Sequence, residues 1–397
     1  MKIAHIVRRF TFSEWGGTET AVWQIARRQK KQGLSPEILC TAALDRAGTE
    51  IIDGIPIRRF PCLYPCFPLS EADRLALDKK GGDPFAPKMM KVLREGDYEI
   101  FHIHAGGRLA RSAARIGIKR NIPRVMSLHG GSCVIPPQEM EQMLRPLKHK
   151  FRYGNIFDRL RGLAGPPERL MDVLLALSRE EAEALKIKFP EIAVEVFPNG
   201  IEHRELPAPE EFRRRYGIPE KRRLILCISR IDYQKNQKLL LKLLERTSST
   251  HLLLIGPITA AWYYEELLAL AETLGVSGRL TVIPGLPPDS PELLRALRCA
   301  DCFVLPSRHE PFGIAALEAL DAGVPLIASR VGGLKDFLID RHNALLFEDD
   351  DPDSLLEAFH HLDPLRTQLI RAGHETAERY NWESLVQTLT GIYRRMR

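Results

Sequence analysis

Short apolar runs alternate with longer helical or irregular segments along most of the chain. Runs of this kind are typical of parallel strands that are buried on both faces. In the first half, the predicted strands are Lys2–Val7, Glu37–Thr41, Ile55–Phe60, Glu99–His104, Arg124–His129 and Val173–Leu177. The alternation predicts a parallel sheet with helices on both faces, as in doubly wound α/β folds.

The pattern starts again after a polar, proline-containing stretch from Glu202 to Arg215, whose composition suits a hinge between domains. The strands predicted beyond it are Arg223–Ser229, His251–Gly256, Leu280–Pro284, Cys302–Leu305 and Leu326–Ser329. The helices predicted there are Asn236–Arg246, Ala261–Leu274, Pro291–Arg298 and a terminal helix within Thr376–Arg397. We therefore expect two doubly wound domains.

Composition is compatible with this expectation. The chain has 397 residues, more than one hydrophobic core normally accommodates. Its apolar content of 44% is that of a globular protein, and no run approaches the roughly 20 apolar residues that span a bilayer. The apolar start before Arg8 is too short for a signal peptide, so we expect a cytoplasmic protein with its 7 cysteines reduced. The net charge of +6 permits anionic partners without requiring nucleic acid.

A candidate ligand site lies between Cys302 and Glu318. A buried strand is followed there by a turn and by a helix predicted over Gly313–Ala322. This arrangement places the helix N-terminus at the carboxyl edge of a sheet, where open α/β folds bind ligands. Glu310 and Glu318 lie eight residues apart at the two ends of the turn. Such a site suits a ligand with a phosphate at the helix end and hydroxyl groups on either side.

Two cations follow the first strand of the second domain. Arg230 comes directly after the strand, and Lys235 comes just before the next helix. Both are therefore expected at the same sheet edge as Glu310, where an Arg fork and a Lys point charge can neutralise a diphosphate. A pair of surface charges on a loop would have the same spacing. Val331-Gly332-Gly333 forms another glycine turn after a strand.

In the first domain, Gly16 and Gly17 precede a predicted helix over Thr20–Gln32. They can form a phosphate cradle, because glycine admits close approach of the backbone to a ligand. A helix start that needs a positive φ explains them equally well.

Histidines end two predicted strands in front of glycine pairs, and alternation places His102 and His104 on one face of the sheet. A lone histidine at a strand end is usually structural. With both strands ending in this way, we expect at least one histidine at the ligand, and His129 is favoured.

The segment Ile135–Arg169 interrupts the strand pattern. Its apolar residues recur at helical spacing, and its cations are Arg145, Lys148, Lys150, Arg152, Arg159, Arg161 and Arg169. A basic amphipathic segment can lie on an anionic membrane or bind an acidic acceptor. A solvated helix packed by its apolar stripe is the alternative.

Taken together, these motifs resemble the retaining, GT-B-fold glycosyltransferases of family GT4. The resemblance rests on Arg230 with Lys235, on Pro306-Ser307-x-x-Glu310-x-Phe312-Gly313, and on the spacing of Glu310 and Glu318. Further matches are Gly16-Gly17, His129, Pro198-Asn199-Gly200-Ile201, and Val331-Gly332-Gly333 with Asp336. The resemblance covers nearly the whole chain and is strongest from Asn199 to Phe347.

The resemblance implies two Rossmann-like domains facing a cleft. Residues 1–198 would bind the acceptor and would be closed by a C-terminal helix, 378–397, that crosses back onto them. Residues 199–377 would bind a nucleotide sugar. Ser229, Asp336 and Ala344 depart from the family pattern. These departures affect the prediction of the nucleotide preference more than the prediction of the activity.

Site roles follow from the same resemblance. Arg230 and Lys235 would hold the donor diphosphate, Glu318 the ribose hydroxyls and Glu310 the hexose hydroxyls. Backbone N–H groups around Phe312 and Gly313 would assist, Gly16 and Gly17 would approach the phosphates, and His129 would lie near the sugar. Candidates on the acceptor side are His104, Arg152, Arg159 and Arg161.

The expected activity is transfer of a hexose from a nucleoside diphosphate sugar to a glycan or lipid-linked saccharide. The resemblance implies retention. Because the cations and the helix N-terminus can stabilise the leaving diphosphate, we expect work without a metal or other cofactor. The basic segment suggests an acceptor that carries phosphate, or work at the cytoplasmic face of the membrane, as in bacterial surface-polysaccharide assembly. Because Glu310 is assigned to hydroxyl binding, attack on the same face assisted by the leaving phosphate is favoured over a covalent intermediate. The acidic run Asp349–Asp353 is interpreted as a helix cap instead of a metal site. A nucleotide-sugar epimerase and a non-catalytic nucleotide-sugar-binding protein are the alternatives.

Overall fold

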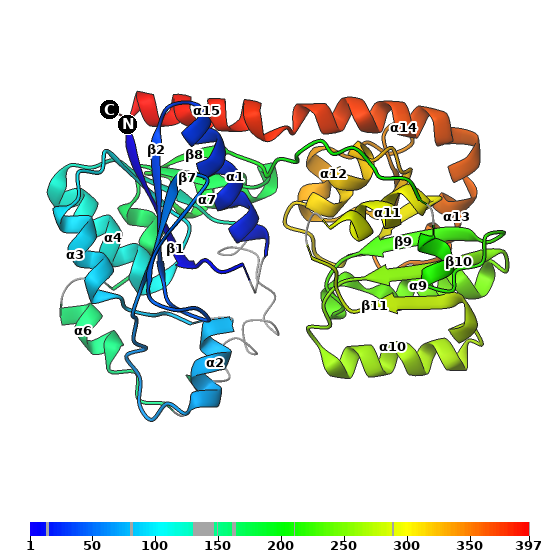
Figure 1. The fold of residues 1–397 in the computed structure, drawn as a ribbon, viewed down its shortest axis with the longest axis horizontal. Coiled ribbons are helices and arrows are strands. Elements are labelled where there is room, and N and C mark those ends of the chain that lie inside the picture. The colour runs from blue at the N-terminus through cyan, green and yellow to red at the C-terminus, as the bar shows by residue number, and fades with distance from the viewer. Residues whose placement is uncertain are drawn as a thin grey trace. The chain divides into compact units, whose positions relative to one another are not determined.

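The computed structural model describes residues 1–12, 16–79, 82–129, 147–148, 150–160, 164–209, 211–287 and 290–396. The chain forms two compact units (Figure 1). Unit 1 comprises Met1–Pro198 together with Trp382–Arg397, and unit 2 comprises Asn199–Asn381. Each is a doubly wound α/β unit with a mainly parallel sheet, as the sequence predicted.

The sheet of unit 1 has the strand order β3-β4-β2-β1-β5-β6-β7-β8. Its strands are β1 (Lys2–Arg9), β2 (Ser35–Thr41), β3 (Gly48–Ile52), β4 (Ile55–Phe60), β5 (Ile100–Ile103), β6 (Arg124–Ser127), β7 (Val173–Ala176) and β8 (Ala193–Val196). All neighbours are parallel except β3 and β4, which form an antiparallel pair. The strand order reverses between β1 and β5, and such switch points are where ligands bind in this class of fold.

Helices cover both faces of this sheet. One face packs on α1 (Gly17–Lys31) and α15 (Trp382–Arg395), with Ile3, Ile100 and Val125 beneath them. The other face packs mainly on α3 (Pro87–Glu95), α4 (Gly107–Arg120) and α7 (Arg179–Lys188). The remaining helical elements of unit 1 are α2 (Glu71–Lys79), α6 (Gly154–Leu160) and the 3₁₀ helix η2 (Pro167–Leu170).

The sheet of unit 2 has the parallel order β11-β10-β9-β12-β13-β14. Its strands are β9 (Arg223–Ile228), β10 (Thr250–Ile255), β11 (Leu280–Ile283), β12 (Cys302–Leu305), β13 (Leu326–Ser329) and β14 (Leu345–Phe347). In chain order this is 3-2-1-4-5-6, the arrangement of dinucleotide-binding folds, and it reverses between β9 and β12.

Helices and 3₁₀ turns connect these strands. They are α8 (Phe212–Arg215), η3 (Tyr233–Lys235), α9 (Gln237–Arg246), α10 (Ala261–Thr273), η4 (Ser277–Arg279), α11 (Pro291–Cys299), α12 (Ile314–Asp321), η5 (Gly332–Asp336), α13 (Pro352–His360) and α14 (Leu362–Arg379). Within the described ranges, no helix combines the length and the apolar character needed to cross a bilayer.

The C-terminal region differs from the sequence prediction. Thr376 belongs to α14 of unit 2, which continues to Arg379, and a separate helix begins at Trp382. The chain therefore re-enters unit 1 at Trp382, four residues after the expected position 378. There Trp382, Val386 and Tyr393 are buried against the sheet, so α15 is part of the core of unit 1.

Candidate functional site

The centre of the candidate site in unit 2 is an ion pair between Lys235 and Glu310. Nζ of Lys235 lies 2.6 Å from Oε2 of Glu310, and both side chains are 12% exposed. Lys235 follows β9 and Glu310 follows β12, so the pair spans the point at which the strand order reverses. The structure thus brings together two residues that the sequence predicted at one sheet edge.

Arg230 is connected to Lys235 through Asp232. Nη1 of Arg230 lies 3.1 Å from Oδ2 of Asp232, and Nη2 donates to Oε1 of Gln234 at 3.1 Å. Asp232 also caps the 3₁₀ turn η3 by accepting from the backbone N–H of Lys235 at 3.2 Å. Asp232 therefore positions both cations. Asp232 was not predicted as a site residue, although its place between Arg230 and Lys235, in front of a helical turn, was the available signal.

The loop that carries Glu310 rests on the glycine pair of the next strand connection. Gly332 has φ +49°, and a Cβ there would lie 2.2 Å from the carbonyl oxygen of Glu310. The N–H of Gly333 donates to that same carbonyl at 2.9 Å. Ser307 donates its hydroxyl to Oε2 of Glu310 at 3.3 Å. The glycine turn after β13 thus allows the close backbone packing that fixes Glu310.

Helix α12 begins directly after this loop. Its N-cap residue is Gly313 at φ +100°, where a Cβ would lie 2.4 Å from Leu334. The Phe312 side chain is buried against Phe337 and Tyr380, which leaves only its backbone for a ligand. Glu318 lies on α12 beyond its first turn and is half-buried. The free N–H groups at the start of α12 attract negative charge.

A further cation, Arg308, lies near the same edge. Its guanidinium stacks over the Tyr233 ring at 4.3 Å and donates to Oδ1 of Asp350 at 3.0 Å. The adjacent Asp351 accepts from the N–H groups of Asp353 and Ser354 at the start of α13. The prediction that the acidic run contains a helix cap is therefore confirmed for Asp351.

In unit 1, Gly16 is the N-cap residue of α1 and Gly17 is its first residue. Neither has a positive φ, since Gly16 has φ −144° and Gly17 is helical. A Cβ on Gly17 would meet nothing within 4 Å. Folding therefore does not demand glycine at position 17, so the explanation by positive φ is wrong. The explanation by close approach of a ligand remains a prediction.

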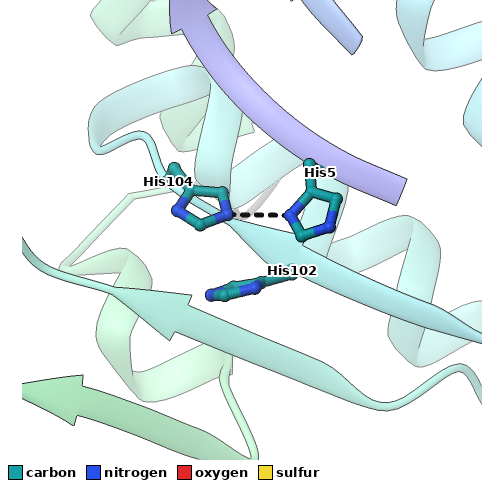
Figure 2. Close-up of side chains that lie close together, drawn as sticks. All are labelled: His5, His102 and His104. Carbon is teal, nitrogen blue, oxygen red and sulfur yellow. Dashed lines mark hydrogen bonds between the residues drawn. The ribbon is translucent and has the colours of Figure 1, made fainter. Parts of the chain in front are cut away.

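The strand-end histidines of unit 1 form a hydrogen-bonded cluster together with His5 of β1. Nδ1 of His104 contacts Nε2 of His129 at 2.9 Å. Nε2 of His104 contacts Nδ1 of His5 at 3.1 Å, as Figure 2 shows. His104 is thus buried with both ring nitrogens occupied, which corrects its expected role as a direct contact for an acceptor. His129 is half-buried and lies at the carboxyl end of β6 with φ +50°.

Burial controls the charge of these rings. It lowers the pKa of His5 and of His129 to about 4. It also lowers the pKa of His102 and His104 well below the usual value, and the neighbouring histidines add to this effect. All four rings are therefore neutral at pH 7. Within the described part of the chain, one ring nitrogen from each of His5, His102 and His104 lies within 4.8 Å of the others, a spacing that could also hold a metal ion.

The basic segment is described only in part. Arg152 and Arg159 are exposed, whereas Arg161 and residues 135–146 lie outside the described residues. Phe151 forms an isolated β-bridge with Phe67 instead of continuing a helix, so the helical spacing was misleading there. Helix α6 exposes Ile156, Phe157 and Leu160.

Comparisons with known proteins agree with this architecture. The family described as Glycosyltransferase Family 4 matches residues 15–205, and the family described as Glycosyl transferases group 1 matches residues 209–375. D-inositol 3-phosphate glycosyltransferase 1 of Catenulispora acidiphila is 28% identical over 400 residues, which cover 96% of this chain and 90% of that protein.

Solved structures are similar over nearly the full length. HepE from Anabaena, in complex with UDP-glucose, has a TM-score of 0.72 at 18% identity and covers 99% of both chains. WaaG, a glycosyltransferase involved in lipopolysaccharide biosynthesis, has a TM-score of 0.65 at 17% identity, with 98% of this chain and 99% of that chain covered. At this identity, the two structures establish the fold alone.

Proposed function

Because the chain belongs to the GT-B-fold glycosyltransferases of family GT4, we propose that it moves a hexose from a nucleoside diphosphate sugar to a glycan or lipid-linked saccharide with retention at the anomeric carbon. The observation that carries the proposal is the Lys235–Glu310 ion pair at the switch point of unit 2. It puts a cation and a hydroxyl-binding carboxylate side by side, as the junction between a diphosphate and a sugar requires.

The donor extends across this edge of the sheet in the proposed complex. Arg230 and Lys235 bind the diphosphate, with the N–H groups at the start of α12 behind it. Glu318 accepts hydrogen bonds from the ribose hydroxyls, and Glu310 accepts them from the hexose. The 2.6 Å contact between Lys235 and Glu310 means that Lys235 shares its charge between the carboxylate and the entering phosphate.

The proposed chemistry depends on stabilising the leaving group. Breaking the bond between sugar and diphosphate leaves positive charge on the sugar and negative charge on the phosphate. Cations held in place before the reaction lower this barrier, because they need no reorganisation as the charge develops. Asp232 supplies this preorganisation by binding Arg230 and capping the turn of Lys235. The protein's own cations take the part that a metal plays in other transferases, and we propose activity without an added metal.

Retention follows, in this proposal, from attack on the same face that the leaving group departs from. A covalent intermediate would need a carboxylate nucleophile below the anomeric carbon. Glu310 is paired with Lys235 and accepts from Ser307. These contacts suit a group that binds hydroxyls better than a free nucleophile.

The acceptor is proposed to be presented at a membrane surface. Four apolar side chains in this part of unit 1 are exposed, namely Phe151, Ile156, Phe157 and Leu160, with exposures of 64%, 50%, 54% and 78%. The exposed cations Arg152 and Arg159 lie among them in the sequence. Apolar side chains interspersed with cations are suited to the headgroup region of an anionic membrane. On the basis of these exposed residues, we propose a role in surface-polysaccharide assembly at the membrane.

Thermal stabilisation by nucleotides tests the donor site. A ligand that binds only the folded state stabilises it by about 2.7 kcal/mol at a hundredfold excess over its Kd. The full-length protein should be screened with UDP, GDP, ADP and their hexose conjugates, starting with UDP-glucose. One nucleoside diphosphate should raise the melting temperature of the wild type and not of Lys235→Ala. No shift with any of them would contradict the proposal.

A further inference from the structure

The histidine cluster of unit 1 is part of a longer chain of hydrogen bonds through seven side chains. From His129 it passes through His104 and His5 to Gln29 of α1, whose Oε1 lies 2.8 Å from Nε2 of His5. It continues from Nε2 of Gln29 to the hydroxyl of Tyr393 of α15 at 3.4 Å. The chain returns through Nδ1 of His102 at 2.6 Å and ends at the hydroxyl of Ser127, 2.8 Å from Nε2 of His102.

Strand register explains how these residues meet. His5 of β1 is paired with His102 of β5. His102 is paired in turn with Val125 of β6, which lies two residues before Ser127. Side chains alternate between the faces of a strand, so these residues continue the rows that begin with Ile3, Ile100 and Val125. Helices α1 and α15 cover this face and supply Gln29 and Tyr393. The hydrogen-bond chain therefore starts and ends on one segment, at His129 just after β6 and at Ser127, the last residue of β6.

The amide of Gln29 determines the direction of every hydrogen bond in this chain. Its Oε1 can only accept, so Nε2 of His5 carries the proton and Nδ1 of His5 is an acceptor. Nε2 of His104 must then donate to His5, which leaves Nδ1 of His104 as an acceptor for Nε2–H of His129. On the other side, Gln29 donates to Tyr393, Tyr393 donates to His102, and His102 donates to Ser127.

We propose that Gln29, acting through His5 and His104, holds His129 as the neutral tautomer that carries its proton on Nε2, so that Nδ1 of His129 is presented as a hydrogen-bond acceptor. Gln29, His5 and His104 are positioning residues in this proposal. If the amide of Gln29 were turned over, each hydrogen bond would reverse, and His129 would present an N–H donor. One buried amide thus decides which kind of group His129 can bind.

Both ring nitrogens of His5, His102 and His104 already form hydrogen bonds within this network. A metal bound by these three rings would have to replace the hydrogen bonds between His5 and His104, and at His102. Low pKa values, caused by burial, keep the rings neutral and able to act as donor and acceptor at once.

For the reaction, the tautomer selects a partner for His129. An acceptor nitrogen binds a hydroxyl group as the hydroxyl donates, and it does not bind a carbonyl or phosphate oxygen. This part rests on the proposed function and on the expectation, drawn from the family resemblance, that His129 lies near the sugar. The tautomer itself is a property of the free protein and is measured without substrate.

The experiment is a long-range proton–nitrogen NMR correlation on the full-length protein labelled with ¹⁵N-histidine, with His129 assigned by the variant His129→Gln. Nitrogen shifts distinguish protonated from unprotonated ring nitrogens. We expect His129 to show a protonated Nε2 and an unprotonated Nδ1, and not to titrate near the usual histidine pKa. A protonated Nδ1, or titration near pH 6.5, would overturn the proposal.

Two variants test transmission from Gln29. Gln29→Leu removes the amide, and Tyr393→Phe removes the hydroxyl that holds its Nε2, so each should shift His129 toward a mixture of tautomers. Thr390→Val is the matched control, because Thr390 of α15 donates to Gln32 of α1 outside this chain. An unchanged His129 spectrum in the folded Tyr393→Phe variant would overturn the proposal. The proposal would also be overturned if the purified protein contained stoichiometric metal and if the N–H signals of His5 and His104 disappeared on loading with Zn²⁺.

The outcomes separate this inference from the proposed function. If the wild-type protein shows the expected tautomer of His129 but binds no nucleotide sugar, the proposed role of Gln29 stands and the transferase assignment of the site is refuted. If the protein binds a nucleotide sugar but His129 carries its proton on Nδ1, the transferase assignment stands and the proposed role of Gln29 is refuted. In an active protein, Tyr393→Phe should lower kcat more than it raises KM for the donor, and a donor that lacks the contacted hydroxyl should be insensitive to the variant.

Discussion

Lys235 and Glu310 lie on connections that follow the first and the fourth strand of unit 2, and their charged groups meet at 2.6 Å. The two strands, β9 and β12, are neighbours in the sheet. One largely buried ion pair therefore joins the two halves of the sheet at its switch point.

Removal of Lys235 tests the role of this pair. Lys235→Ala should lower kcat by about a hundredfold to a thousandfold, the usual effect of removing one preorganised group that stabilises developing charge. It should also lower the free energy of unfolding of unit 2 by about 3 kcal/mol, because Glu310 is left as a buried unpaired charge. Steady-state kinetics and calorimetry measure the two effects.

A double variant separates stability from catalysis. Lys235→Met combined with Glu310→Gln should recover most of the lost stability, since no unpaired charge remains. Activity should not recover. Lys238→Ala is the control and should keep wild-type rates, because Lys238 lies three residues after Lys235 but is a half-buried cation paired with Glu266. Near-normal turnover in Lys235→Ala would contradict the assignment.

Gly332→Ala should disturb Glu310 without changing any charge. The new Cβ would lie 2.2 Å from the Glu310 carbonyl oxygen at a backbone φ of +49°. We expect a loss of about 1–3 kcal/mol in stability and weaker binding of the donor, measured by calorimetry and isothermal titration. Gly278→Ala is the matched control, because a Cβ there meets nothing within 4 Å. Equal donor affinity in both variants would show that the glycine turn does not support the site.

The buried histidines should make unit 1 sensitive to acid. The pKa of His5 falls from 6.5 in the unfolded chain to about 4 in the fold. The unfolded state therefore binds more protons as the pH drops from 6.5 to about 4, and the free energy of unfolding decreases over this window. His5 alone accounts for about 3 kcal/mol at the acid end. Above pH 6.5 the effect disappears.

Scanning calorimetry between about pH 7.5 and about pH 4.5 measures this slope. His5→Asn should flatten the slope, whatever its effect on stability at neutral pH. His203→Asn is a control of the opposite sign, because the hydrogen bond to Asp321 raises the pKa of His203. A slope in His5→Asn as steep as in the wild type would contradict the assignment of a neutral buried ring.

The apolar surface of α6 should bind anionic vesicles. The double variant Phe157→Ser/Leu160→Ser should lose cosedimentation with phosphatidylglycerol vesicles. Arg152→Gln combined with Arg159→Gln should weaken binding by roughly thirtyfold, at about 1 kcal/mol for each cation near the surface. Ile187→Ser on α7, where the isoleucine is 83% exposed, is the control for a single exposed apolar residue. Cosedimentation unaffected by any of these changes in and next to α6 would refute a membrane contact there.

Much of the fold is predictable because buried parallel strands are continuous apolar runs. The predicted strands Ile55–Phe60, Cys302–Leu305 and Leu326–Ser329 coincide with β4, β12 and β13. Strands β3 and β8 were not predicted. Both lie at the edges of the unit 1 sheet and are largely exposed, so burial imposes no apolar pattern on them. The break at Asn381 was also missed, because the residues on both sides are helical.

Only the site residues that directly follow strands could be predicted from the sequence. The approach of Lys235 to Glu310 follows from the rule that ligands bind at the carboxyl edge of a parallel sheet. The contacts of Asp232, and the packing of Gly332 on Glu310, depend on which strands are neighbours. So does the chain from His129 to Ser127, in which Gln29 meets Tyr393 across 364 positions of sequence. Spacing within a segment holds no information about such contacts.

Analysis of the reaction product tests whether the protein transfers a hexose with retention. A nucleoside diphosphate hexose that stabilises the protein is incubated with it and with saccharide and lipid-linked saccharide acceptors, and the mixture is followed by proton NMR. The proposed transfer predicts free nucleoside diphosphate together with a new glycoside that has the anomeric configuration of the donor, and neither product with Lys235→Ala. A changed sugar that is still attached to its nucleotide, or a glycoside of inverted configuration, would contradict it.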